Sequence, residues 1–215
     1  VRHLARKTGV VIPEKASSRA EKDQDSLREQ LIRVNQVAAV HYASNLFSPG
    51  GMEAQAYLKQ RAIRENVVRE FRLGFALDGW RHLKDFLEKQ AIPLKTAEQA
   101  GLLVAGKEAS TYDRFRNRLM FPIEDASGRV VAFGGRNIGA GEPKYLNSPE
   151  SEIYHKSKTL YGIFFAKKSI VQQDRCILVE GYTDVISFHA KGIENVVASS
   201  GTSLTIEQIR LIRRL

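Results

Sequence analysis

The stretch Cys176-Ile177-Leu178-Val179-Glu180-Gly181-Tyr182-Thr183-Asp184 decides the fold of this chain. Its apolar run predicts a short strand over 177–180, and the residues after Gly181 have helical spacing through 183–191. Gly192 ends that helix, and a second apolar run over 195–199 predicts another strand. Strand, helix and strand in this order indicate a βαβ unit, whose parallel strands are expected to be buried on both faces.

A further helix is predicted after the second strand. Thr205 and Gln208 have the spacing of a capping box, in which each side chain bonds the other residue's backbone N–H. Two parallel strands do not form a stable sheet by themselves. We therefore expect the chain to contain only the first part of a larger α/β domain.

Two carboxylates follow the first of these strands. Glu180 ends the strand, where ligands of open α/β sheets bind, and Asp184 lies about one helical turn further. Such carboxylates can hold divalent metal ions for phosphoryl transfer, although two of them supply only part of the ligands required. The alternative is that Asp184 stabilises a helix N-terminus and Glu180 is a solvated strand end. Spacing alone leaves both interpretations open.

The N-terminal half has a different pattern. Residues 1–12 predict a short helix followed by a β-like segment, and 14–25 is so polar that a linker is expected. Ser26 and Glu29 match a capping box at the start of a long amphipathic helix that ends at Leu46. Three further helices are predicted over 52–71, over 79–90 with Asp78 as N-cap, and over 95–100.

A β-hairpin is predicted in the middle of the chain. Apolar runs over 119–123 and 130–133 flank a four-residue loop, 125–128, that ends in glycine. Pro122 favours an edge position or a bulge in the first strand, because proline has no N–H to donate. The predicted fold class is α/β: an α+β subdomain with a hairpin-containing sheet, followed by a βαβα unit.

The composition and net charge of the chain limit the kinds of function that it can have. The chain has 215 residues, 43% of them hydrophobic, and one cysteine, Cys176, so no internal disulfide is possible and a cytoplasmic protein is expected. It has no apolar stretch of membrane-spanning length and no C-x-x-C or H-x-x-x-H spacing for an internal zinc site. Lys and Arg number 33 against 24 Asp and Glu, a net charge of +9 that favours a nucleic-acid partner over a membrane.

Several cations lie beside glycine or aromatic residues in the middle of the chain. Lysine and arginine bind phosphate oxygens, and Phe115 or Tyr145 could stack on a base. Each group alone is also typical of a hairpin end or a solvated charge. The cations in question are Arg114, Arg116, Arg136, Lys144 and Lys156.

Taken together, these motifs resemble the bacterial replicative primases of the DnaG type. The similarity is dense and in order over most of 27–215, whereas the Glu180 segment alone would fit any TOPRIM domain, including those of topoisomerases and some nucleases. The block over 144–149, which such topoisomerases and nucleases lack, disfavours that alternative. The motifs are Tyr112-Asp113-Arg114-Phe115-Arg116, Met120-Phe121-Pro122-Ile123, Phe133-Gly134-Gly135-Arg136, Lys144-Tyr145-Leu146-Asn147-Ser148-Pro149-Glu150, His155-Lys156, Leu160-Tyr161-Gly162 and Val179-Glu180-Gly181-Tyr182-Thr183-Asp184-Val185.

The resemblance implies a DNA-dependent RNA polymerase that makes short RNA primers on single-stranded DNA from ribonucleoside triphosphates. It implies that Glu180 is the catalytic acid at a Mg²⁺ or Mn²⁺ site, with Asp184 as an auxiliary acid. The remaining metal ligands are expected beyond Leu215. Ala62 stands where the family usually has glycine, after a basic position of the family. The residues that the resemblance assigns to template or triphosphate binding are Arg61, Arg114, Arg116, Arg136, Lys144, Asn147 and Lys156.

The resemblance also implies a division of the chain. Residues 1–25 would join a zinc-binding domain to the core, 26–172 would form the basic subdomain, and 173–215 would begin the TOPRIM domain. The Zn²⁺ domain and a C-terminal domain that contacts the replicative helicase would lie outside this sequence, so we expect the fragment to be inactive alone. A metal-free module that binds single-stranded nucleic acid is the alternative for the isolated chain.

Overall fold

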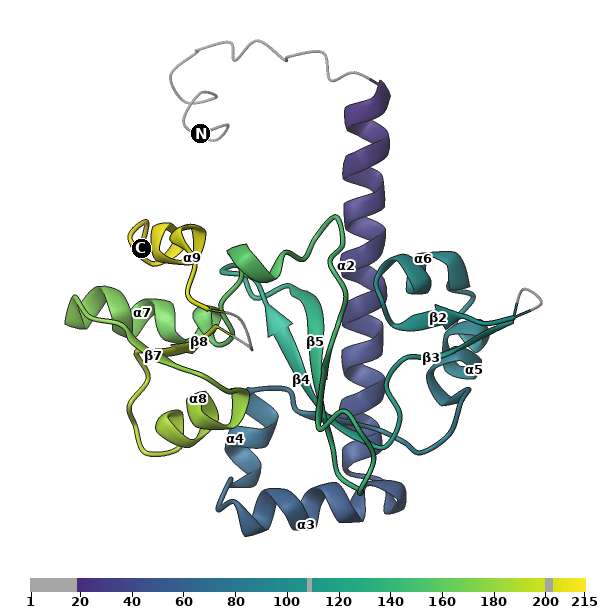
Figure 1. The fold of residues 1–215 in the computed structure, drawn as a ribbon, viewed down its shortest axis with the longest axis horizontal. Coiled ribbons are helices and arrows are strands. Elements are labelled where there is room, and N and C mark those ends of the chain that lie inside the picture. Colours follow the sequence, from purple (N-terminus) through teal and green to yellow (C-terminus); the bar gives the residue numbers. More distant parts are fainter. Residues whose placement is uncertain (1–18, 108–109, 200–202) are drawn as a thin grey trace, which may run out of the picture.

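The computed structural model describes residues 19–107, 110–199 and 203–215 (Figure 1). The helix and β-like segment expected over 1–12 lie outside these ranges, as do residues 14–18 of the expected linker. In the described ranges the fold is mixed α/β, as predicted, with an antiparallel sheet and a separate parallel strand pair. No helix there is long and apolar enough to cross a bilayer.

The first described element is the 28-residue helix α2, Arg19–Leu46. It begins ahead of Ser26, so 19–25 are helical and the expectation of a linker is wrong for them. Ser26 lies inside the helix, where its hydroxyl accepts a hydrogen bond from Gln30 Nε2 at 3.3 Å instead of capping. Polarity was misleading because Arg, Ala, Glu, Lys and Gln are good helix formers without an apolar face. The proposed domain boundaries at 25/26 and 172/173 stay predictions.

The helix expected over 52–71 is broken. After the 3₁₀ turn η1, Pro49–Gly51, the chain forms α3, Met52–Gln60, and then α4, Glu65–Glu70. Ala62 between them has φ 56°, a left-handed conformation that ends an α-helix. The next helices are α5, His82–Lys89, and α6, Leu94–Gln99. Helix α5 starts later than expected, with Arg81 rather than Asp78 at its N-cap.

A four-stranded antiparallel sheet forms the centre of the molecule. Its strands are β1, Gly74–Ala76, β4, Arg118–Glu124, β5, Val130–Asn137, and β6, Tyr145–Asn147, in the order β1-β4-β5-β6. The predicted hairpin is β4–β5, which pairs up to Glu124↔Val130, so the loop runs from Asp125 to Arg129, one residue beyond expectation. Pro122 pairs with Phe133 of β5, but it lies past Met120, the last residue of β4 that pairs with β1, so on that side it has no strand neighbour, as at an edge.

Both faces of this sheet are covered. Leu119, Phe121 and Ile123 on β4 pack into one core with α4 and α8, whereas Met120 points into a second core beneath α2. The elements α5, α6 and a hairpin of β2, Leu103–Ala105, and β3, Thr111–Asp113, lie on the outer side of α2 (Figure 1). The sheet is therefore a buried layer between two sets of helices.

The C-terminal part contains the predicted βαβα unit. After η2, Lys156–Lys158, and α7, Ile163–Gln173, it consists of β7, Ile177–Val179, α8, Tyr182–His189, β8, Val196–Ala198, and α9, Ile206–Ile212. The strands are parallel, as expected, and Thr205 and Gln208 form the predicted capping box. Strand β8 is buried, but Leu178 in β7 is 41% exposed, so the expectation of burial on both faces fails for β7.

Candidate nucleic-acid interface and catalytic turn

A cationic hollow of about 620 Å³ lies between α3, β5 and the segment before β6. Its lining includes Arg61, Arg136 and Lys144, so the structure brings three of the predicted binding residues together. The guanidinium of Arg136 lies 4.1 Å from the centre of the Tyr57 ring, and that of Arg61 lies 5.4 Å from it. Cation–π contacts of this kind hold both charges beside an aromatic face while leaving their N–H groups able to bind anions.

The two glycines before Arg136 have a packing role. A Cβ on Gly134 would lie 2.4 Å from Cε2 of Tyr182, and one on Gly135 would lie 2.9 Å from Cδ1 of Phe115. Both glycines leave room for aromatic rings of the protein, whereas the sequence had suggested room for a ligand. Phe115 itself is only 1% exposed, so the expectation that it stacks on a base is wrong. Tyr145 is 42% exposed, with Arg136 5.9 Å from its ring centre, and stacking of this ring on a base stays a prediction.

Arg118 is a buried cation that sequence reasoning missed. It is 5% exposed, and its Nη1 donates to the carbonyl of Gly135 at 3.3 Å and to that of Pro143 at 2.9 Å. These bonds tie β5 to the segment that leads into Lys144. The alternation of side chains along β4 could have predicted that Arg118 faces inward. It could not have predicted which carbonyls Arg118 bonds, because these lie far along the chain.

The start of α8 is linked directly to β6. The Tyr182 hydroxyl donates to Oδ1 of Asn147 at 2.8 Å, and Nη2 of Arg114 donates to the Asn147 carbonyl at 3.2 Å. The Tyr182 ring also stacks on Phe121, with the ring centres 5.1 Å apart. Asn147 and Arg114, both predicted as binding residues, therefore lie on the frame that joins the sheet to the turn after β7.

The turn after β7 presents Glu180 and Asp184, and both side chains are exposed. Oδ2 of Asp184 accepts the backbone N–H of Gly181 at 3.2 Å, which is the capping role left open by the sequence. Exposed carboxylates fit a divalent cation chemically, but these two provide only part of a ligand set.

The rest of that ligand set is not found among the described residues. Within those ranges, no group of three or more His, Cys, Asp or Glu side chains could hold a metal ion. The further ligands expected beyond Leu215 stay a prediction, as does the metal-binding role of Glu180 and Asp184.

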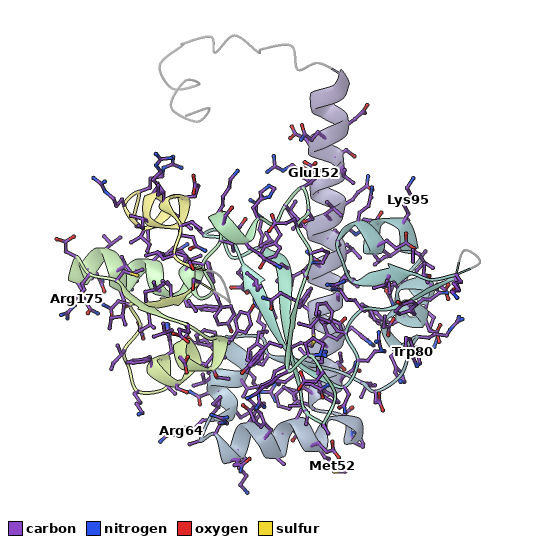
Figure 2. The ribbon with its side chains drawn as sticks, in the orientation of Figure 1. Met52, Arg64, Trp80, Lys95, Glu152 and Arg175 are labelled. Carbon is purple, nitrogen blue, oxygen red and sulfur yellow. The ribbon has the colours of Figure 1, made fainter. Side chains whose placement is uncertain are left out.

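A second candidate binding surface, the Trp80 patch, consists of Arg116, Trp80 and Tyr112, and Figure 2 places Trp80 on the outer side of the molecule. There the Arg116 guanidinium lies 4.1 Å from the centre of the Trp80 ring and 5.5 Å from that of Tyr112. Trp80 is 60% exposed, which is unusual for the largest apolar side chain. Sequence reasoning missed Trp80, although the only tryptophan of the chain, directly after a glycine, was an available signal.

Lys156 begins η2 and is half-buried. Its backbone N–H donates to Oε1 of Glu150 at 2.9 Å, and Oε2 of the same carboxylate lies 3.1 Å from Nδ1 of His155. The Lys156 N–H, followed by His155, lowers the pKa of Glu150 from its ordinary value. Glu150 is thus a carboxylate anchor for the segment that contains Lys156.

Two family models match the chain. Residues 41–167 match the family model described as DNA primase catalytic core, N-terminal domain, and 174–215 match that of the Toprim domain. The chain belongs to the DNA primase family. It is 47% identical to the DNA primase of Synechocystis over 89% of this chain and 31% of that protein, and 42% identical to that of Halalkalibacterium halodurans over 100% and 36%. The chain thus spans about a third of the curated primases that it matches.

Solved primase cores have the same fold. The RNA polymerase domain of the Mycobacterium tuberculosis primase, in complex with a double-stranded DNA oligomer bearing a 6-nucleotide overhang, has a TM-score of 0.83 and 38% identity, covering 87% of this chain and 59% of that one. A DnaG primase catalytic domain bound to single-stranded DNA has a TM-score of 0.82 and 38% identity over 88% and 61%. These matches confirm the predicted resemblance and the fold.

Proposed function

We propose that this chain is the front part of the polymerase core of a bacterial replicative primase, which makes short RNA primers on single-stranded DNA. The Tyr182–Asn147 hydrogen bond is the observation that most supports this function. It joins the carboxylate turn at Glu180 to β6, the strand next to Arg136 and Lys144. Phosphate-binding cations and metal-binding carboxylates on one connected frame are what nucleotidyl transfer requires.

The cationic hollow would bind phosphates of the template or of the incoming triphosphate. Arg61, Arg136 and Lys144 supply the charge, and Tyr145 offers an exposed ring face for a base. Arginine binds phosphate through several N–H groups at once, whereas Lys144 acts as a point charge. Their charges would hold the triphosphate in line for attack.

The Trp80 patch would extend this path for the template strand. An exposed indole supported from one side by Arg116 is a stacking platform that tolerates any base. The single strand would then contact the protein at the hollow and beside α5. The solved relative bound to single-stranded DNA supports a single-stranded template as the ligand.

In the proposed reaction, the oxygen of a 3′-hydroxyl group loses its proton to water and bonds to the α-phosphorus of a ribonucleoside triphosphate. The bond from that phosphorus to the bridging oxygen breaks, and pyrophosphate leaves. Glu180 and Asp184 would hold Mg²⁺ or Mn²⁺ together with carboxylates from the remainder of the TOPRIM domain. The bound ion would neutralise charge on the entering and leaving oxygens. The cations of the hollow would orient the triphosphate.

The whole protein would act in the cytoplasm, with a zinc-binding domain before this segment and a helicase-contacting domain after it. The 215-residue chain would bind single-stranded DNA without making RNA. Its cationic hollow and Trp80 patch are formed by described residues, whereas the two carboxylates are only part of a metal site. A binding module without catalysis is therefore the second candidate function for the isolated chain.

Template-dependent incorporation of labelled ribonucleotides by the full-length protein tests the proposal. Glu180→Gln should abolish RNA synthesis and leave single-stranded DNA affinity within about twofold, because only the metal-binding charge is lost. Glu88→Gln, an exposed carboxylate on α5, is the matched control and should retain synthesis. Normal synthesis by the Glu180 variant would remove this residue from the catalytic role.

A further inference from the structure

Helix α9 packs against η2, the segment that contains Lys156, through a fully buried amide. Gln208 has 0% exposure, and Nε2 donates to two carbonyls of this segment, those of Lys156 and Thr159, each at 2.9 Å. Its Oε1 accepts the backbone N–H of Thr205 at 3.1 Å. In a capping box, the Gln208 side chain needs only the bond that its Oε1 accepts from Thr205. The two protons on Nε2 are therefore free to hold the carbonyls of the other segment.

The other capping residue makes a contact of the same kind. Oγ1 of Thr205 donates to the carbonyl of Ser157 at 2.5 Å, in addition to accepting the N–H of Gln208. Three of the five carbonyls from His155 to Thr159 are therefore held by the first turn of α9, those of Lys156, Ser157 and Thr159. The spacing of Thr205 and Gln208 predicts only the capping box. It does not predict the bonds to these carbonyls, which lie about fifty positions away in the sequence.

Lys156 is also held from its N-terminal side. Its N–H bonds to Oε1 of Glu150, and its carbonyl bonds to Gln208, so the peptide groups on both sides of the residue are fixed by side chains. Glu150 is exposed, whereas Gln208 is buried, so one anchor acts from solvent and the other from the core. The flexible lysine side chain then starts from a fixed backbone position.

We propose that Gln208 is a positioning residue that sets Lys156 for phosphate binding, with Glu150 as its partner on the opposite side. This inference rests on the proposed function and deepens it. Lys156 belongs to the stretch that matches the primase core model, and Gln208 belongs to the stretch that matches the Toprim model. The TOPRIM part would thus contribute the placement of a cation as well as its carboxylates.

A double-mutant cycle in the full-length primase tests the inference, with single-stranded DNA affinity measured against salt concentration. Gln208→Met keeps the side-chain length and removes its three hydrogen bonds. We expect it to weaken binding about three- to tenfold and to lower the salt slope by ~0.7, as Lys156→Ala does, because one phosphate contact is lost. In the Lys156→Ala background, Gln208→Met should have no further effect, since the residue it positions is absent.

Controls make the cycle decisive. Gln99→Met makes the same change at an exposed position on α6 and should leave affinity and slope unchanged. Glu150→Ala, at an exposed residue whose loss does not open the core, should repeat the Gln208 result if the methionine variant is unstable. Equal effects of Gln208→Met with and without Lys156 would overturn the inference. Wild-type affinity of Lys156→Ala would overturn it too, while the Glu180 test of RNA synthesis would stand independently.

Discussion

At the scale of single residues, Glu124 is the most perturbed carboxyl of the described chain that the proposed reaction does not use. It is 3% exposed at the β-bulge that ends β4, and its Oε1 lies 3.1 Å from Nη1 of Arg72. Burial raises the pKa of Glu124 to about 7, and Arg72 offsets only part of that effect. The desolvation of a buried carboxylate therefore outweighs one partly exposed ion pair here.

The pKa of Glu124 predicts a pH dependence of stability. Between its ordinary pKa of 4.5 and about 7, the folded state holds a proton that the unfolded state has lost. The free energy of unfolding should therefore fall as pH rises through this window, and level off above it. Glu124→Gln removes the titrating group and should flatten this component of the profile.

Denaturant unfolding at pH 5, 6, 7 and 8 measures the effect as the difference between wild type and variant. His41, whose pKa burial lowers to about 4, adds a component of opposite sign that is common to both proteins and cancels in the difference. Glu70→Gln, an exposed carboxyl on α4, is the control and should follow the wild-type profile. Parallel profiles for wild type and Glu124→Gln would contradict the prediction.

At the scale of elements, the N-terminus of helix α5 is capped by a residue of a β-strand. Asp113, the last residue of β3, accepts the N–H of Leu83 at 2.8 Å and that of Lys84 at 2.9 Å. The N-cap residue itself, Arg81, has no side-chain cap bond. This contact joins α5 to the strand that leads into Arg116, so it also supports the Trp80 patch.

Removal of the cap should destabilise the chain. Asp113→Ala leaves two helix N–H groups of α5 without their acceptors and should lower the free energy of unfolding by about 1–2 kcal/mol. Asp85→Asn, which breaks only the exposed pair with Arg81, should cost under about 0.5 kcal/mol. Denaturant unfolding followed by Trp80 fluorescence measures both variants. A cost for Asp113→Ala no larger than that for Asp85→Asn would show that the cap contributes little.

At the scale of the whole molecule, the predicted binding residues divide among separate parts of the surface. Arg61, Arg136 and Lys144 share the hollow, Arg116 lies beside Trp80, and Lys156 lies in η2 against α9. Arg114 points into the frame and bonds a backbone carbonyl. A bound single strand that contacts several of these parts would release counterions at each of them.

The salt dependence of binding should therefore fall stepwise. Arg136→Ala should reduce the slope of log affinity against log salt by ~0.7 for each phosphate contact that is lost. Lys95→Ala changes an exposed cation on α6 that is not among the residues lining the hollow, and should leave the slope unchanged. Titration of single-stranded DNA at several salt concentrations gives both slopes. An unchanged slope for Arg136→Ala would exclude a direct phosphate contact by this residue.

The sequence by itself determined the features that depend on near neighbours. Apolar alternation predicted the β4–β5 hairpin, the βαβ order predicted the parallel strands, and the spacing of Thr205 and Gln208 predicted their capping box. The order of the motifs also identified the family. The hairpin, the parallel strands and the capping box follow from side-chain periodicity or from hydrogen bonds within a few residues, whereas the family follows from the resemblance of the motifs.

Only the tertiary structure decided the features that depend on packing between distant segments. It showed that Gly134 makes room for Tyr182, that Asp113 caps α5, and that Gln208 holds Lys156. It also placed Phe115 in the core and Trp80 at the surface. The physical reason is that a side chain's partners across the core, and hence its role, are set by how whole elements pack, which local periodicity does not specify.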